Sequence, residues 1–336
     1  GLMIPILALV SLGGGSFFEG LSILGSENPE YLRVLTQENF EGKQVSVPWP
    51  TLLTGMMFIQ IFYWSTNQVI VQRAMAAKSL AEGQKGVLFA SAMKLVGPLM
   101  LCLPGIIALH MPDLIIEKQD QVYGAVVRHV LPDWSLGLFA AVLMGSILSS
   151  FNSALNSAST LFSLQFYKGY INEKASEIDI VNVGKKFGII LAIASILIAP
   201  MLAQLDSIFQ YLQKVNGIYS VPIIAIFLLG ILTKHIPAIG AKIGMIVGFV
   251  SYAYFVFFPV EDLHWLHMYF ISFTWSIMVM LLIGYLNPKT QKEIEKSDER
   301  DPAPVDMAPW SKAKDASMAI VFATVAIYIL LSLAAS

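Results

Sequence analysis

The amino-acid sequence predicts an all-α, polytopic membrane protein. Hydrophobic residues make up 56% of its 336 positions and charged residues only 13%, whereas charged residues form roughly a quarter of a typical soluble domain. Apolar runs recur at about the 20-residue length that a helix needs to cross a bilayer. Because backbone groups in the hydrocarbon must bond to one another, we expect these runs to be helices with the lipid bilayer as their surroundings.

The individual spans follow from the apolar runs. We predict nine segments, at about 1–22, 50–71, 87–110, 134–165, 183–204, 216–233, 239–259, 265–286 and 316–336. The chain opens with "GLMIPILALV", which has neither an initiating methionine nor a basic residue before the apolar run. We interpret this opening as that of an N-terminally truncated fragment and not as a signal peptide.

Basic residues predict the orientation of the segments. If all nine segments cross the membrane, alternate connections lie on opposite sides. The second, fourth, sixth and eighth connections hold 15 of the 21 Lys and Arg residues, and the other connections hold 4. By the positive-inside rule the first set is cytoplasmic. Of the two remaining cations, Lys214 is expected at the outer interface, and Lys94 either snorkels to the inner surface or faces a wet, paired interior.

The second segment, 50–71, has a polar interruption. It reads "TLLTGMMFIQIFYW", then "STNQ" at 65–68, and then "VIVQR". Such an interruption is tolerated only where protein or a water-filled cavity satisfies the exposed groups. Broken helices near the midplane bind small solutes in secondary transporters. A second irregular helix is expected at "SIFQYLQKVNGIYSVP", which contains Gly217 and Pro222.

The fourth segment contains an uncharged run of hydroxyls and amides, "SSFNSALNSAST", at 149–160. Ser146, Ser149, Ser150 and Ser153 share one face of a helix by their spacing. Hydroxyl and carbonyl oxygens are ligands for a hard cation and hold it weakly enough to release it. The alternative is helix packing, because small hydroxyl residues let membrane helices approach closely.

These motifs together resemble the solute:sodium symporter family, in its sugar-transporting branch of sodium/glucose and sodium/galactose symporters. The resemblance is carried by "PWP" before the second segment and by four longer motifs, "YWSTNQVIVQRAMAAKS", "MKLVGPLMLCLPG", "ILSSFNSALNSASTLFSLQFY" and "IFQYLQKVNG". It implies a leucine-transporter-like core of two inverted five-helix repeats. On that map residues 1–24 are the last helix of the first repeat and 25–49 an extracellular loop. Residues 50–233 are the second repeat, and 234–336 are three peripheral helices with a cytoplasmic loop at 287–315.

The resemblance also implies the site residues. It places sodium at the hydroxyls of Ser149 and Ser150 and near the backbone carbonyl of Ser146. It places the solute at Gln60, Tyr63, Trp64, Asn67, Lys94 and Gln213. Lys94 and Gln213 match the substrate-binding lysine and glutamine, and Tyr63 matches the aromatic inner gate. Asn67 is also a candidate for capping or gating. Such polar groups read sugar hydroxyls, and an aromatic ring covers the apolar face of a sugar.

The resemblance implies a sodium-coupled symporter that imports a galactose- or glucose-like sugar by alternating access in a plasma membrane, such as a bacterial inner membrane. A symporter of the same family for another solute, such as an organic anion or sialic acid, is the alternative, since Lys94 would pair with a carboxylate. A homodimer is a candidate assembly, and no nucleic-acid partner is expected.

Enzyme function is not expected, because no nucleotide-binding, metalloprotease or catalytic-triad motif occurs in a supporting context. His264 and His267 in "HWLH" are expected as an interfacial anchor and not as a metal pair. The glycine-rich "SLGGGSFFEG" is expected as helix packing or a bend, since no strand precedes it.

Overall fold

The computed structural model describes residues 1–27, 29–32, 39–40, 43–44, 47–114, 116, 118–205, 207–258, 260, 263–291, 293–294 and 305–334. The chain divides into two compact units, Gly1–Asn28 with Lys94–Ile208, and Pro29–Met93 with Phe209–Ser336. The predicted loops 25–49 and 287–315 lie partly outside the described residues. Apart from one antiparallel pair of two-residue strands, β1 (Asn39–Phe40) and β2 (Lys43–Gln44), the described elements are helical, which confirms the all-α prediction.

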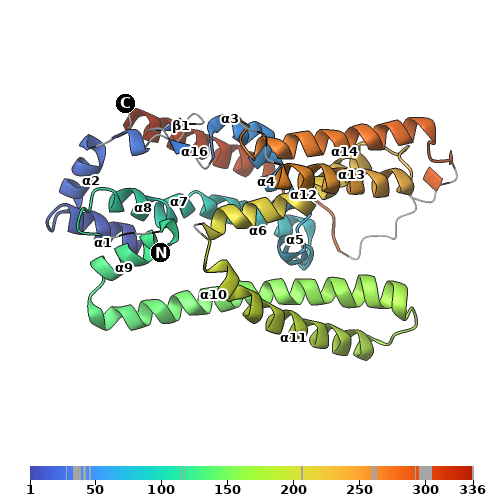
Figure 1. Ribbon diagram of the computed structural model, residues 1–336, viewed down its shortest axis with the longest axis horizontal. Coiled ribbons are helices and arrows are strands. Elements are labelled where there is room, and N and C mark those ends of the chain that lie inside the picture. Colours follow the sequence, from blue (N-terminus) through green and yellow to red (C-terminus); the bar gives the residue numbers. More distant parts are fainter. Residues whose placement is uncertain are drawn as a thin grey trace. The chain divides into compact units, whose positions relative to one another are not determined.

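The first unit is dominated by a long helical hairpin, in which α10 and α11 lie side by side (Figure 1). Helix α10 continues without a break into a π-helical stretch, η4, and so extends beyond the predicted segment 134–165. Shorter helices precede the hairpin. The elements are α1 (Met3–Leu12), α2 (Phe17–Ser26), α7 (Gly97–Leu101), α8 (Leu103–Ala108), η3 (Gln119–Gln121), α9 (Val122–Val130), α10 (Asp133–Leu161), η4 (Phe162–Ile171) and α11 (Glu177–Leu202).

The second unit has its core where α4, α12, α13 and α14 pack together. Its elements are η1 (Pro29–Leu32), α3 (Trp49–Thr51), the π-helical η2 (Leu52–Met56), α4 (Met57–Ser65), α5 (Gln68–Met75), α6 (Leu80–Lys94), α12 (Ile208–Leu232), α13 (Ala238–Phe257), α14 (His267–Leu286) and α16 (Ala313–Ala334).

The number of membrane spans differs slightly from the prediction of nine. Six helices among the described residues are long and apolar enough to cross a membrane, and there are up to eight spans if two bent pairs count as one each. The bent pairs are α1 with α2, at 79°, and α6 with the helices of 97–108, at 42°. The remaining predicted segment, 50–71, is divided among α3, η2, α4 and α5. The protein is therefore a multi-pass membrane protein in which one predicted span is interrupted.

The glycine-rich stretch after α1 forms a bend, one of the two roles expected for it from the sequence. Gly14 and Gly15 have φ values of 58° and 109°, a region that residues with a Cβ rarely adopt. Ser16 then caps α2 by accepting a hydrogen bond from the backbone N–H of Glu19 at 3.3 Å. The two glycines thus let the chain turn sharply between α1 and α2.

Contacts between connections on the predicted outer side agree with the predicted alternation of sides. His110 Nε2, at the outer end of the predicted third segment, lies 2.6 Å from the carbonyl oxygen of Glu27, in the first connection. The Asp120 carboxylate, in the third connection, accepts a hydrogen bond from the backbone N–H of Ile208, in the fifth connection, at 2.9 Å. Each contact joins residues predicted to share the outer side.

Contacts on the predicted inner side follow the same rule. The backbone N–H of Leu80 donates to the Asp306 carbonyl at 2.9 Å, which joins the second and eighth connections. The backbone N–H of Lys289 donates to the His235 carbonyl at 2.9 Å, which joins the eighth and sixth connections. All are predicted to be cytoplasmic. Which side is the cytoplasm stays a prediction from the positive-inside rule.

Helix α12 corrects one prediction. We expected an irregular helix because of Gly217 and Pro222, but α12 is continuous from Ile208 to Leu232. A Cβ added to Gly217 would lie 2.6 Å from the hydroxyl of Tyr252 and closer still to the Tyr269 ring. Pro222 is buried in the same helix. Helices tolerate proline in a membrane when their neighbours support them, and here the tyrosines of α13 and α14 pack directly against the α12 backbone.

This close approach predicts a stability loss for Gly217→Ala. The added methyl group must displace Tyr252 or Tyr269, and overpacking of this kind costs about 1–3 kcal/mol. Gly230→Ala is the matched control in the same helix, because a Cβ there would meet nothing within 4 Å. Thermal unfolding of the purified protein in detergent should show a lower melting temperature for Gly217→Ala than for Gly230→Ala. Equal melting temperatures would contradict the packing described here.

Candidate functional site

The interruption between α4 and α5 is built from local hydrogen bonds. The backbone N–H groups of Thr66 and Asn67 both donate to the Phe62 carbonyl, at 3.0 and 3.1 Å. The Asn67 backbone is extended, with ψ of 119°, and its side-chain oxygen accepts from the Val69 N–H at 3.0 Å. Asn67 is therefore the N-cap of α5, one of the two roles proposed for it from the sequence. The polar tetrad interrupts the helix as predicted.

Three predicted solute residues lie on one face of α4, because Gln60, Tyr63 and Trp64 follow the i, i+3, i+4 spacing of a helical face. Asn67 follows the end of α4, at the interruption. The Gln60 side chain is exposed, the Tyr63 side chain is 38% exposed, and those of Trp64 and Asn67 are half-buried. The rings of Tyr63 and Trp64 meet edge to face, with centroids 5.4 Å apart.

The opposite face of α4 anchors this helix in the core of the second unit. Phe58 and Phe62 are 6% and 7% exposed. The Phe58 ring lies 4.3 Å from the Phe273 ring of α14, and the Phe62 ring lies 5.7 Å from the Tyr219 ring of α12. Because Phe58 and Phe62 are buried on one face of α4, the polar face that carries Tyr63 points away from the core of the second unit.

Gln213 lies on α12, less than two helical turns before Tyr219. Its side chain is half-buried, and its backbone carbonyl accepts a hydrogen bond from the Tyr269 hydroxyl. The Tyr219 hydroxyl donates to the Asn216 side chain at 2.6 Å. Sequence reasoning did not single out Tyr219 or Tyr269 as supports of this region. The only signal was the polar and aromatic spacing of 213, 216 and 219 on one helix.

Lys94 is the last residue of α6 and stands at the 42° bend before α7. Its side chain is exposed among the described residues. Helix α6 begins at Leu80, and Gln84 near its start bonds to the eighth connection. Ten residues of helix place Lys94 about 15 Å further along the axis than Gln84.

The predicted sodium ligands Ser146, Ser149 and Ser150 lie in the middle of α10, on its exposed surface. The hydroxyls further along the run bond to their own helix. Ser153 donates to the Ser149 carbonyl at 3.0 Å and Ser157 to the Ser153 carbonyl at 2.9 Å. Such bonds to the carbonyl four residues earlier are common for serine and threonine within helices.

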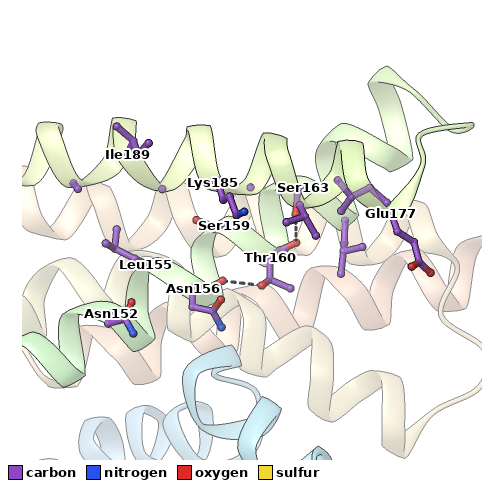
Figure 2. A pocket seen from close by; sticks show the side chains of 15 residues that line it. Asn152, Leu155, Asn156, Ser159, Thr160, Ser163, Glu177, Lys185 and Ile189 are labelled. Atoms are coloured by element: carbon purple, nitrogen blue, oxygen red, sulfur yellow. Dashed lines mark hydrogen bonds between the residues drawn. The ribbon is translucent and has the colours of Figure 1, made fainter.

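The later part of the run lines a groove between α10 and α11, with a volume of about 900 Å³ (Figure 2). Figure 2 shows Asn152 and Asn156 on the α10 wall and Lys185 on the α11 wall. At its floor the two helices approach closely, because a Cβ on Gly188 would lie 2.9 Å from the Ser159 hydroxyl. Small residues that let helices approach are the packing role considered above.

The histidines of "HWLH" differ from the expected interfacial anchor. His264 is 1% exposed, so it is part of the core and not an exposed belt residue. His267 Nδ1 lies 2.6 Å from the Thr54 hydroxyl of η2. Within the described ranges no group of three or more His, Cys, Asp or Glu side chains could hold a metal ion. His267 thus contacts η2, at the start of the interrupted segment 50–71.

The predicted site residues are divided between the two units. Lys94 and the three serines belong to the first unit, and the residues of α4, α5 and α12 belong to the second. Within the second unit, contacts between Phe62 and Tyr219 join the helix that carries Tyr63 to the helix that carries Gln213.

Comparison with known proteins gives a family match over most of the chain. Residues 1–248 match the Sodium:solute symporter family. The uncharacterized symporter YidK of Escherichia coli (strain K12) is 40% identical over 330 residues, which cover 98% of this chain and 56% of the relative.

Two further relatives carry a solute in their names. The sodium/glucose cotransporter of Vibrio parahaemolyticus is 32% identical over 78% of this chain and 51% of its own length. Sodium/glucose cotransporter 1 of Ovis aries is 31% identical over 71% of this chain and 41% of its own length. The chain thus spans about half the length of the curated relatives it matches.

The N-cap at Asn67 predicts a local loss of stability in Asn67→Ala. Removal of a side-chain cap costs about 1 kcal/mol, which corresponds to about fivefold faster hydrogen exchange of the amides in Gln68–Met75 if they exchange by local opening. Asn67→Ser is the control, because the serine hydroxyl can accept the same bond. Hydrogen exchange with mass spectrometry measures both variants. Wild-type exchange rates in Asn67→Ala would show that Asn67 does not cap α5.

Proposed function

This chain belongs to the sodium:solute symporter family, and on that premise we propose that the protein is a sodium-coupled symporter that imports a sugar. The observation that carries the proposal is the conjunction of an interrupted, locally capped helix with an uncharged hydroxyl face on α10. Interrupted helices and oxygen ligands without carboxylates suit the reversible binding of a small solute and a monovalent cation. Such a protein is a transporter and not an enzyme.

We assign the cation to the face of α10 that carries Ser146, Ser149 and Ser150. The hydroxyls of Ser149 and Ser150 and the backbone carbonyl of Ser146 supply neutral oxygens to Na⁺. Sodium entry down its gradient drives transport, with about 2.3 kcal/mol per charge for each 100 mV of membrane potential.

We assign the solute to the face of α4 with Gln60, Tyr63 and Trp64 and to Asn67 at the interruption, together with Lys94 and Gln213. Amide and ammonium groups bond to hydroxyls, and the Tyr63 ring closes over the apolar face of a sugar. The two sodium/glucose cotransporters among the relatives support a sugar over an organic anion. Asn67 contributes here mainly by holding the start of α5.

Transport then proceeds by alternating access in a plasma membrane, for which we propose a bacterial inner membrane. The proposed architecture has residues 1–24 as the last helix of a first inverted repeat, 50–233 as the second repeat and 234–336 as peripheral helices. Sodium stabilises the outward-open arrangement, Tyr63 closes over the solute, and movement of the repeats opens the inner side.

The sodium assignment predicts a specific defect in Ser150→Ala. Loss of one oxygen ligand, worth about 1 kcal/mol, should raise the sodium concentration for half-maximal sugar uptake about fivefold. Ser195→Ala is the control, because the Ser195 hydroxyl donates to the Leu191 carbonyl of its own helix at 2.8 Å. Uptake of labelled glucose or galactose into proteoliposomes measures the dependence. An unchanged sodium requirement in Ser150→Ala would move the ion to another site.

The solute assignment predicts weaker sugar binding in Lys94→Ala and Gln213→Ala. A hydrogen bond to a charged group is worth about 1.5–3 kcal/mol, so Lys94→Ala should raise the half-maximal sugar concentration about 10- to 150-fold. Lys214→Ala is the control, because that ammonium lies over the Trp265 ring at 5.9 Å. Inhibition of uptake by an organic anion such as sialic acid, with no inhibition by hexoses, would contradict the sugar and favour an anionic solute.

A further inference from the structure

The segment just before the last helix is bound to the start of α6. Residues 305–312, which we call the clasp, lead directly into α16. Asp306 pairs with Ser79 in a parallel bridge, and its carbonyl accepts from the Leu80 N–H at 2.9 Å. The backbone N–H of Trp310 donates to Gln84 Oε1 at 2.7 Å. One short segment therefore holds residues 79–84, at the start of α6, although it lies more than 220 residues later in the sequence.

Side chains reinforce these backbone contacts. The Lys85 ammonium lies 5.9 Å from the centre of the Trp310 ring and also pairs with Glu82 at 2.7 Å. A cation over an indole face is attracted to it. Asp306 shapes the clasp itself, because its carboxylate accepts from the Ala308 N–H at 2.9 Å.

Two helices flank the residues that the clasp contacts, because α5 ends shortly before Ser79 and α6 begins at Leu80. Neither α5 nor α6 contains a buried residue. Helix α5 is separated from α4 by the interruption at Asn67, so it can change direction without moving the anchored aromatic face of α4. Beneath the clasp lies a cavity of about 640 Å³, lined by the end of α5, the start of α6 and the first turns of α16. The clasp thus holds the turn that joins α5 to α6, and a cavity lies beside this turn.

We propose that the clasp fastens the α5–α6 turn to α16 and must release this turn when α5 moves during transport. Gln84 and Trp310 are its positioning residues. The proposal rests on the proposed transport function, because it assigns the moving part of that function to α5 and the restraint to the clasp. Movement of α5 opens or closes the inner side below Tyr63, and the clasp sets how readily this happens.

A reversible cross-link tests the release step. Bridged strands lie about 4.8 Å apart, within the Cα separation that a disulfide spans. The double variant Ser79→Cys, Asp306→Cys is made in a Cys102→Ala background, which removes the single native cysteine. Oxidation should form the disulfide and lower sodium-driven sugar uptake at least tenfold, and a reductant should restore it. The two single-cysteine variants, oxidised in the same way, should keep their uptake.

The outcomes separate this inference from the proposed function. Full uptake by the cross-linked protein, or failure of the two cysteines to cross-link, would contradict the role proposed for the clasp. Absence of sodium-driven sugar uptake in the reduced and single-cysteine proteins would count against the sugar symporter instead.

A second measurement needs no transport at all. Gln84→Leu removes the acceptor for the Trp310 N–H, whereas Gln84→Glu keeps an acceptor oxygen at the same length. Limited proteolysis should cut the clasp several-fold faster in Gln84→Leu than in Gln84→Glu or the wild-type protein. Equal cleavage in all three proteins would show that Gln84 does not hold the segment.

Discussion

The structure depends on one constraint, that backbone N–H and C=O groups inside a bilayer must find partners within the protein. The interruption between α4 and α5 meets this constraint locally. Asn67 accepts from the Val69 N–H, and the Thr66 hydroxyl donates to the Phe62 carbonyl at 3.0 Å. These partners belong to the same short segment, so part of the hydrogen bonding at the break is local. One predicted span therefore becomes two half-helices, α4 and α5.

The two halves of the interrupted segment, α4 and α5, are held in different ways. Phe58 and Phe62 bury one face of α4 against α12 and α14, so this half is fixed to a core. Helix α5 has no buried residue and continues through a short turn into α6, which the segment 305–312 contacts. An anchored half that carries Tyr63 and a second half without buried residues are what the proposed gate at Tyr63 requires.

The hydroxyls of α10 show how one composition can serve two purposes. Ser153 and Ser157 donate to carbonyls one turn earlier in the helix. Ser159 of α10 and Ser163 of η4 face glycines of α11 and permit close helix packing. Ser149 and Ser150 precede both groups on an exposed surface. Neutral hydroxyls at that place can bind a cation without the strong hold of a carboxylate, which suits an ion that must be released.

The sequence by itself determined the helical membrane class and the interruption at 65–68, because apolar length and polar side chains act on neighbouring residues. For the glycines at 13–15 it left helix packing and a bend as alternatives. Only the tertiary structure decided that α12 is continuous, that His264 is buried and that residue 306 lies beside residue 79. The contact of Gly217 with Tyr252 depends on the shape of helices distant in the chain. Local hydrogen bonding and hydrophobicity are encoded by adjacent residues, whereas such contacts depend on how surfaces far apart in the sequence fit together.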